Sequence, residues 1–162
     1  MNHGLMIIVA GLLAWPLQSM ASGVLKLSSV ELRFAPDEPQ GELYAHNIGD
    51  TPLYLDVEQT LVLNPGAISE RSMAISEVAR PTLLITPSRL VLAPGQKYRM
   101  NLKVLSMPTR NQVWRVTFRP RQRVIVQGRG AEGQSAPLSV SVGYGVVIYQ
   151  RAAHRPARFQ QE

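Results

Sequence analysis

The sequence lacks cysteine altogether, has only three histidines, and draws just 6% of its 162 residues from the aromatic types. Without cysteine the chain has no disulfide, no thiol nucleophile and no thiolate ligand for a metal. Its stability must therefore come from a hydrophobic core. Three scattered histidines do not supply a zinc or iron site built on imidazole. We expect neither a metal nor a cofactor.

Catalytic motifs are absent as well. The chain has no Gly-x-Ser-x-Gly, no glycine-rich phosphate loop before a helix, no His-Glu-x-x-His and no aspartate-rich calcium loop. His46 falls in an alternating segment, which is typical of a half-exposed structural residue in a strand rather than of a general base. We therefore expect a protein that is not an enzyme.

Charged side chains are missing from the first 21 residues, which hold an apolar run from Leu5 to Trp15 followed by Pro16. The run is too short to cross a hydrocarbon core of about 30 Å, and small residues precede position 22, as in a secretory cleavage site. We expect a signal peptide at 1–21, one domain at 22–153, a disordered basic tail at 154–162, and no stable membrane insertion after cleavage.

Basic residues outnumber acidic ones, 17 to 11, which gives a net charge of +6. Many of them fall between Lys97 and Arg129, a concentration that on its own would suit nucleic acid. Export from the cytoplasm argues against that partner. Basic side chains that alternate outward from strands would instead give a positive surface for an acidic partner.

Short alternating segments separated by turns make up the rest of the chain. Apolar residues recur at every second position over 53–57, 98–104 and 114–118, and Asn-Pro-Gly and Ala-Pro-Gly at 64–66 and 93–95 predict turns. Residues 119–136 are polar and glycine-rich, and we expect a mobile loop around a short run at 124–126. With no amphipathic helix, the pattern predicts an all-β, immunoglobulin-like antiparallel sandwich of about seven strands, with a barrel as the alternative.

The clearest alternation is LSVSVGYGVVIY at residues 138–149, which predicts a single extended strand. One face is apolar and the other carries serine and glycine. Such a strand has something to bury against on one side only. The partner of that face is either the core of the domain itself or another protein.

Three stretches together resemble the amino-terminal domain of the PapD-like periplasmic pilus chaperones, and among these the alternative-clade proteins. They are TPSRLVLAPGQKYRM at 86–100, MPTRNQVWRVTF at 107–118, and the strand at 138–149 followed by Arg151. The resemblance covers residues 24–153. The family carries two such domains, and we expect the second to be absent from this chain.

The resemblance implies a periplasmic, non-enzymatic chaperone that binds pilus subunits by donating its last strand during pilus assembly, in company with an outer-membrane usher. The donated side chains would be Leu138, Val140, Val142, Tyr144 and Val146. Exposed edge strands would also allow a homodimer. A structural immunoglobulin-like envelope module is the alternative, and a basic enzyme or ligand binder that uses the segment 119–129 is a third.

The sequence departs from the family at the two basic residues that hold the subunit's terminal carboxylate. Alignment on the family's landmarks places Glu31 and Val147 at those positions, and neither is basic. Arg33 and Arg115 are the nearest substitutes and become the candidate carboxylate anchor. Arg99 is expected to be a structural residue whose charge is paired inside the fold.

Overall fold

The computed structural model describes residues 23–36, 41–121 and 142–153, and the backbone of residues 124–129 and 135–140. The expected signal peptide at 1–21 and tail at 154–162 lie outside these residues. Within them the regular structure is β-strand, apart from one 3-10 turn, η1 (Ile75–Glu77). No helix in this part of the chain has the length and hydrophobicity that crossing a bilayer requires.

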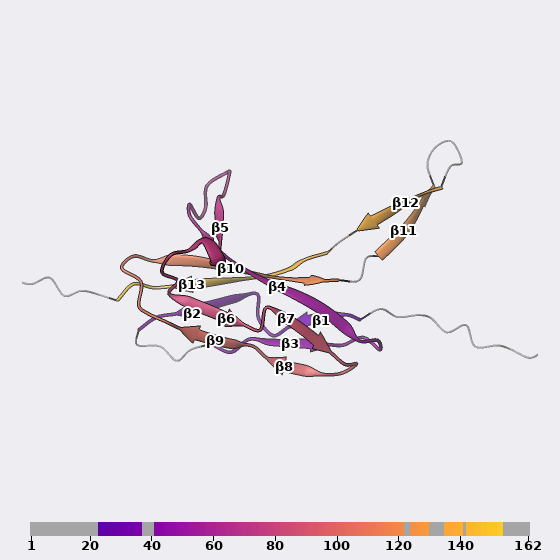
Figure 1. Ribbon diagram of the computed structural model, residues 1–162, viewed down its shortest axis with the longest axis horizontal. Helices are drawn as coiled ribbons and strands as arrows, with labels where there is room; N and C mark the ends of the chain where they lie inside the picture. Colours follow the sequence, from indigo (N-terminus) through magenta and orange to yellow (C-terminus); the bar gives the residue numbers. More distant parts are fainter. Residues whose placement is uncertain (1–22, 37–40, 122–123, 130–134, 141, 154–162) are drawn as a thin grey trace, which may run out of the picture.

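Two main sheets form the sandwich (Figure 1). The first has the order β1 (Leu25–Leu27), β3 (Tyr44–Asn47), β8 (Lys97–Arg99). The second has the order β2 (Glu31–Phe34), β13 (Tyr144–Gln150), β10 (Gln112–Pro120), β4 (Leu53–Val62), β5 (Ser72–Ala74), with β7 (Arg89–Leu92) also beside β4. Two smaller pairs are β6 (Leu83–Thr86) with β9 (Asn101–Val104), and β11 (Val124–Arg129) with β12 (Ser135–Val140).

Alternation along the strands places the core between the two sheets. In β10 the side chains of Trp114, Val116 and Phe118 are completely buried, while the residues between them face outward. One cluster of buried residues joins both sheets, including Leu25 and Ala45 from the first. Burial of this apolar surface is the main stabilising contribution in a chain without disulfides. The predicted immunoglobulin-like sandwich is confirmed.

The two predicted turns form as expected. Gly66 and Gly95 have φ angles of 81° and 71°, in the left-handed region that favours glycine. Each follows a proline, which fixes the preceding φ and brings the chain into the turn. The turns at 64–66 and 93–95 lead from β4 toward β5 and from β7 to β8.

The prediction of one continuous strand over 138–149 is wrong. The chain forms β12 and then β13, and residues 142–143 between them belong to neither. The expected loop at 119–136 is also wrong, because residues 119–120 complete β10 and residues 124–129 pair with β12 as a hairpin. Figure 1 shows this hairpin reaching away from the sandwich, beyond the ends of β10 and β13.

The sandwich is not wholly antiparallel. β13 pairs antiparallel with β10 along its full length, but it pairs parallel with β2 on its other side. The parallel pairing covers Val147 to Gln150 opposite Glu31 to Phe34. This arrangement gives β13 two neighbours at its end and one at its beginning.

Candidate functional site

The beginning of β13 has an edge that no described strand covers. Its pairing with β2 starts at Val147, whose N–H donates to the carbonyl of Val30 at 2.9 Å. Tyr144, Gly145 and Val146 pair only with β10 among the described strands. An edge with open main-chain groups is the feature that accepts an added strand from another chain.

The five predicted subunit-binding residues lie in four different environments. Leu138 and Val140 lie in β12, where their backbone partners are Val126 and Val124, and their side chains are outside the described residues. Val142 is 54% exposed, which suits a partner-binding residue. Tyr144 is half-buried against the domain's own core.

Val146 differs from the other four residues, because its side chain is completely buried in the core of the domain. Its register partner on β10, Val116, is equally buried. Ile148 continues the same inward face, so the core occupies the apolar face of β13 from Val146 onward. Gly145, between Tyr144 and Val146, is exposed, and a Cβ added there would contact nothing within 4 Å, so the space outside it is open.

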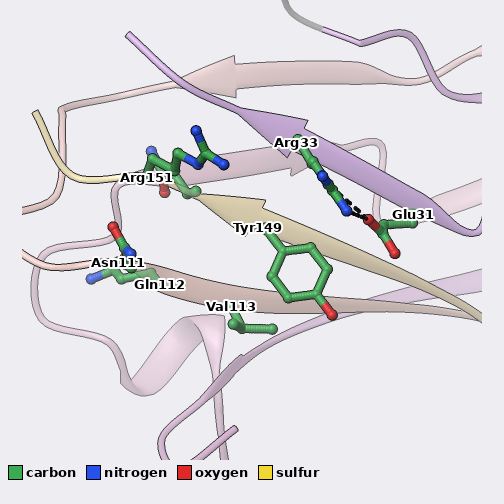
Figure 2. Close-up of a pocket in the computed structure, with 8 residues that line it drawn as sticks. Glu31, Arg33, Asn111, Gln112, Val113, Tyr149 and Arg151 are labelled. Carbon is green, nitrogen blue, oxygen red and sulfur yellow. Dashed lines mark hydrogen bonds and ion pairs between the residues drawn. The ribbon is translucent and has the colours of Figure 1, made fainter.

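A shallow groove of about 330 Å³ lies beside the end of β13, on the outward face (Figure 2). Tyr149, 42% exposed, stands between β2 and β10 in this groove. Arg33 points toward Glu31, and its Nε and Nη2 donate to Oε1 of that carboxylate at 2.9 and 2.8 Å. Other residues of the lining are Asn111, Gln112, Val113, Gln150 and Arg151.

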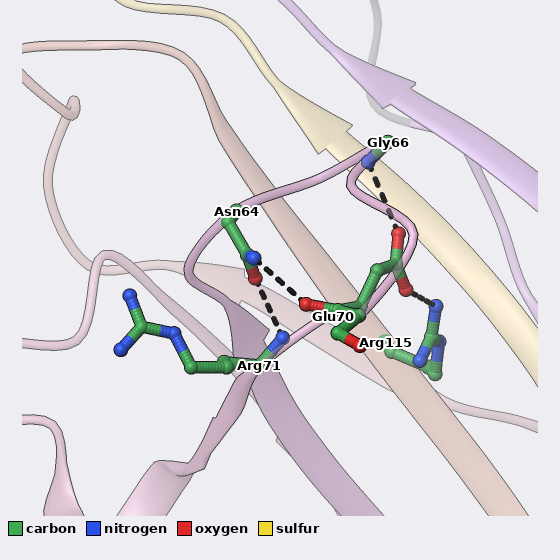
Figure 3. A network of polar contacts seen from close by, with 6 residues as sticks. Asn64, Gly66, Glu70, Arg71 and Arg115 are labelled. Atoms are coloured by element: carbon green, nitrogen blue, oxygen red, sulfur yellow. Dashed lines mark hydrogen bonds and ion pairs between the residues drawn. The ribbon is translucent and has the colours of Figure 1, made fainter.

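Arg115 lies outside the groove and has its own carboxylate partner (Figure 3). Its Nη2 donates to Oε2 of Glu70 at 2.6 Å, and the N–H of Gly66 donates to the other oxygen at 3.2 Å. Together the arginine and the backbone donor lower the pKa of Glu70 below its usual range. Asn64 braces the same loop, because it accepts from the N–H of Arg71 and donates to the carbonyl of Ser69.

The sheet register brings together the two positions at which the sequence departs from the basic residues of the family. Glu31 and Val147 are direct partners across β2 and β13, and Arg115 is the partner of Val147 across β13 and β10. Arg115, Val147 and Glu31 therefore form one row on the outward face, and Arg33 lies one row further along. The two candidate anchor residues share a face, but each is held by a carboxylate of this chain.

Sequence reasoning missed Arg151 and Glu70 as parts of this surface. Arg151 was a landmark of the resemblance, and its N–H donates to the carbonyl of Phe34 at 2.8 Å, which fixes it beside the groove. Arg99 is paired as expected, with Glu42 at 2.6 Å, but the pair is not inside the fold, because the arginine side chain is 65% exposed. His46 is half-exposed in β3, as predicted.

Comparison of the sequence with known proteins finds no matching family model and no matching curated protein. Among solved structures, a chain of the chaperone–tip adhesin complex of CFA/I fimbriae biogenesis aligns with 82% of this chain at 15% identity and a TM-score of 0.63, over 59% of its own length. The class 5 fimbriae chaperone CfaA aligns with 81% at 18% identity and 0.59, over 57% of its length.

A chain of the CsuC–CsuE pre-assembly complex from the Csu pili of Acinetobacter baumannii aligns with 80% of this chain at 11% identity and a TM-score of 0.57, over 57% of its length. This chain thus spans less than two thirds of each of these solved chains. At such identities the likeness establishes the fold. The protein has the immunoglobulin-like fold of the PapD-like fimbrial chaperones.

Proposed function

We propose that this protein is a non-enzymatic, periplasmic, chaperone-like protein that binds fimbrial subunits by lending them the strand segments β12 and β13. The observation that carries the proposal is the edge of β13 at Tyr144 to Val146, which β2 leaves uncovered. A subunit strand placed there would gain main-chain hydrogen bonds, and the apolar side chains that precede Tyr144 would fill pockets of the subunit.

The division of the apolar face supports this proposal. Val142 is exposed, whereas Val146 and Ile148 are buried in the domain. The donated set is therefore Leu138, Val140 and Val142, with Tyr144 at the boundary, and Val146 anchors the strand to its own domain. A partner would also stabilise the β11–β12 hairpin, because an isolated two-stranded hairpin is marginally stable in water.

The solved structures with the same fold support a subunit as the partner. Two of them come from complexes of a fimbrial chaperone with a tip adhesin subunit. Because this chain aligns with less than two thirds of each, the usher and the periplasmic location are part of the proposal, as is a homodimer through edge strands.

A terminal carboxylate of the subunit would be held in the groove beside Tyr149. Two of the five N–H donors of Arg33 contact Glu31, so the guanidinium retains donors for a second carboxylate. Arg151 lines the same groove and has no carboxylate partner among the described residues. We therefore place Arg151 beside Arg33 in this role, with Arg115 as the weaker candidate because it lies outside the groove and is bound to Glu70.

The decisive experiment is co-expression of the full chain with the fimbrial subunits of its own organism, followed by size-exclusion chromatography. We expect a stable one-to-one complex that is lost when Val140 and Val142 are both replaced by aspartate. Val91→Asp is the matched control, since Val91 is 55% exposed on β7 and should retain the complex.

The outcome separates the two main functions. If the Val140 and Val142 substitutions leave the domain folded and abolish the complex, strand lending is supported. If they unfold the domain, the segment belongs to the domain's own core, and the structural envelope module is the better interpretation. A complex that persists with both substitutions would contradict the proposed function outright.

A further inference from the structure

A row of basic side chains crosses the first sheet, on the face turned away from the core. Lys26, His46 and Lys97 are direct register partners across β1, β3 and β8. Their neighbours Leu25 and Ala45 are buried, so the row faces outward. Adjacent strands lie about 4.8 Å apart, which puts the Cα atoms of the two lysines about 10 Å from each other.

The row lies in a groove of about 260 Å³, lined by Lys26, Leu27, Ser28, Tyr44, His46 and Lys97. The Nζ of Lys97 lies 4.1 Å from the centre of the Tyr44 ring, a cation–π contact that holds the lysine against the tyrosine. The Nε2 of His46 lies 3.2 Å from the carbonyl oxygen of Gly95. Because a carbonyl only accepts, Nε2 is the donor, and the contact fixes the ring in the row.

The neighbouring row of the same face shows how this surface binds a carboxylate. Tyr44 and Arg99 are register partners, and between them they hold Glu42. Arg99 Nη2 lies 2.6 Å from one oxygen of that carboxylate, and the Tyr44 hydroxyl donates to the other at 2.7 Å. The hydrogen bond to Glu42 raises the pKa of the Tyr44 hydroxyl.

No described carboxylate occupies the row of Lys26 and Lys97. Elsewhere on the described surface, exposed arginines have acidic partners, as Arg33, Arg89, Arg115 and Arg119 do on strands and Arg121 does just after β10. The two lysines have none within the part of the chain that the structure describes. The row of Lys26 and Lys97 therefore lies beside a row that holds a carboxylate, and its own positive charge is not neutralised by any described carboxylate.

We propose that Lys26, His46 and Lys97 form a docking site for an acidic peptide segment of a partner protein. Carboxylates of aspartate or glutamate would take the position that Glu42 takes in the next row. The site lies on the sheet opposite β13, so it goes beyond the lending of a strand and does not depend on it. The partner recognises the positive charge of the two lysines by charge complementarity.

The test uses the full chain and a fluorescein-labelled peptide of six glutamates, with six glutamines as the neutral control, in fluorescence anisotropy at about 50 mM salt, where charge pairs are weakly screened. Replacing both Lys26 and Lys97 by glutamine should weaken peptide binding about fivefold. The matched control is Lys103→Gln with Arg110→Gln, which removes the same charge from two exposed residues that have no acidic partner among the described residues and should change binding by less than about twofold.

Every outcome decides the proposal. Selective loss in the variant of the row, at an unchanged melting temperature, supports it. Equal loss in both double variants would show that net charge alone attracts the peptide. The proposal would also fail if the chain bound vesicles containing phosphatidylglycerol but not the glutamate peptide, because the row would then recognise a lipid surface.

Discussion

Replacing Val146 by alanine tests where the domain's own core ends along β13. The side chain is completely buried and packs in the cluster that includes Val116 and Ile148. The substitution removes two methyl groups, which costs about 1.6 kcal/mol in transfer free energy, and a cavity penalty adds to that. We expect the free energy of unfolding to fall by about 2–3 kcal/mol in total, and the melting temperature by about 6–12 °C.

Val142→Ala is the companion variant, since Val142 lies four residues upstream and is 54% exposed. Its unfolding free energy should stay within about 0.5 kcal/mol of the parent. Urea denaturation followed by the fluorescence of Trp114, which is completely buried, measures both. Equal destabilisation of the two variants, or a Val146→Ala protein as stable as the parent, would refute a boundary between core and partner-binding segment at Tyr144.

Two further predictions concern polar contacts. Gln150→Leu should lower the free energy of unfolding by about 1–3 kcal/mol in urea, because the buried Trp114 Nε1, now 3.2 Å from the Gln150 amide oxygen, would lose its acceptor. The parent should be more stable than Glu70→Gln at neutral pH, because Arg115 lowers the pKa of Glu70 in the folded chain. That difference should shrink as the pH falls below the ordinary glutamate value of 4.5 and be lost as the pH passes the lowered pKa of the folded chain, as thermal melts across pH 3–7 would show.

Alternation in the sequence predicted the core strands because it records which face each residue occupies. Spacing alone puts Trp114, Val116 and Phe118 on one face of a strand, and all three side chains are completely buried. The turns around Gly66 and Gly95 followed from local chemistry, since proline and glycine restrict the backbone wherever they occur. These features depend on neighbours in sequence, which is why a single chain was enough to find them.

The break between β12 and β13 could not be found in this way. Apolar residues continue at every second position from β12 through Val142 into β13, although β12 pairs with β11 in the hairpin and β13 pairs with β10 in the sandwich. A period of two shows which face of a strand each residue occupies, but it does not show which other strand pairs with it. The same limit applies to the arginines, because Arg115 meets Glu70 only when a loop 45 residues away folds across the sheet.

The two proposed surfaces lie on different sheets and use different physical interactions. The edge of β13 offers main-chain groups and apolar side chains, so its strength depends on burial and is weakly affected by salt. The row of Lys26, His46 and Lys97 offers exposed charge, which salt screens over about a Debye length. With the core between them, one partner can bind at the edge while an acidic segment occupies the row, and neither contact requires the other to form.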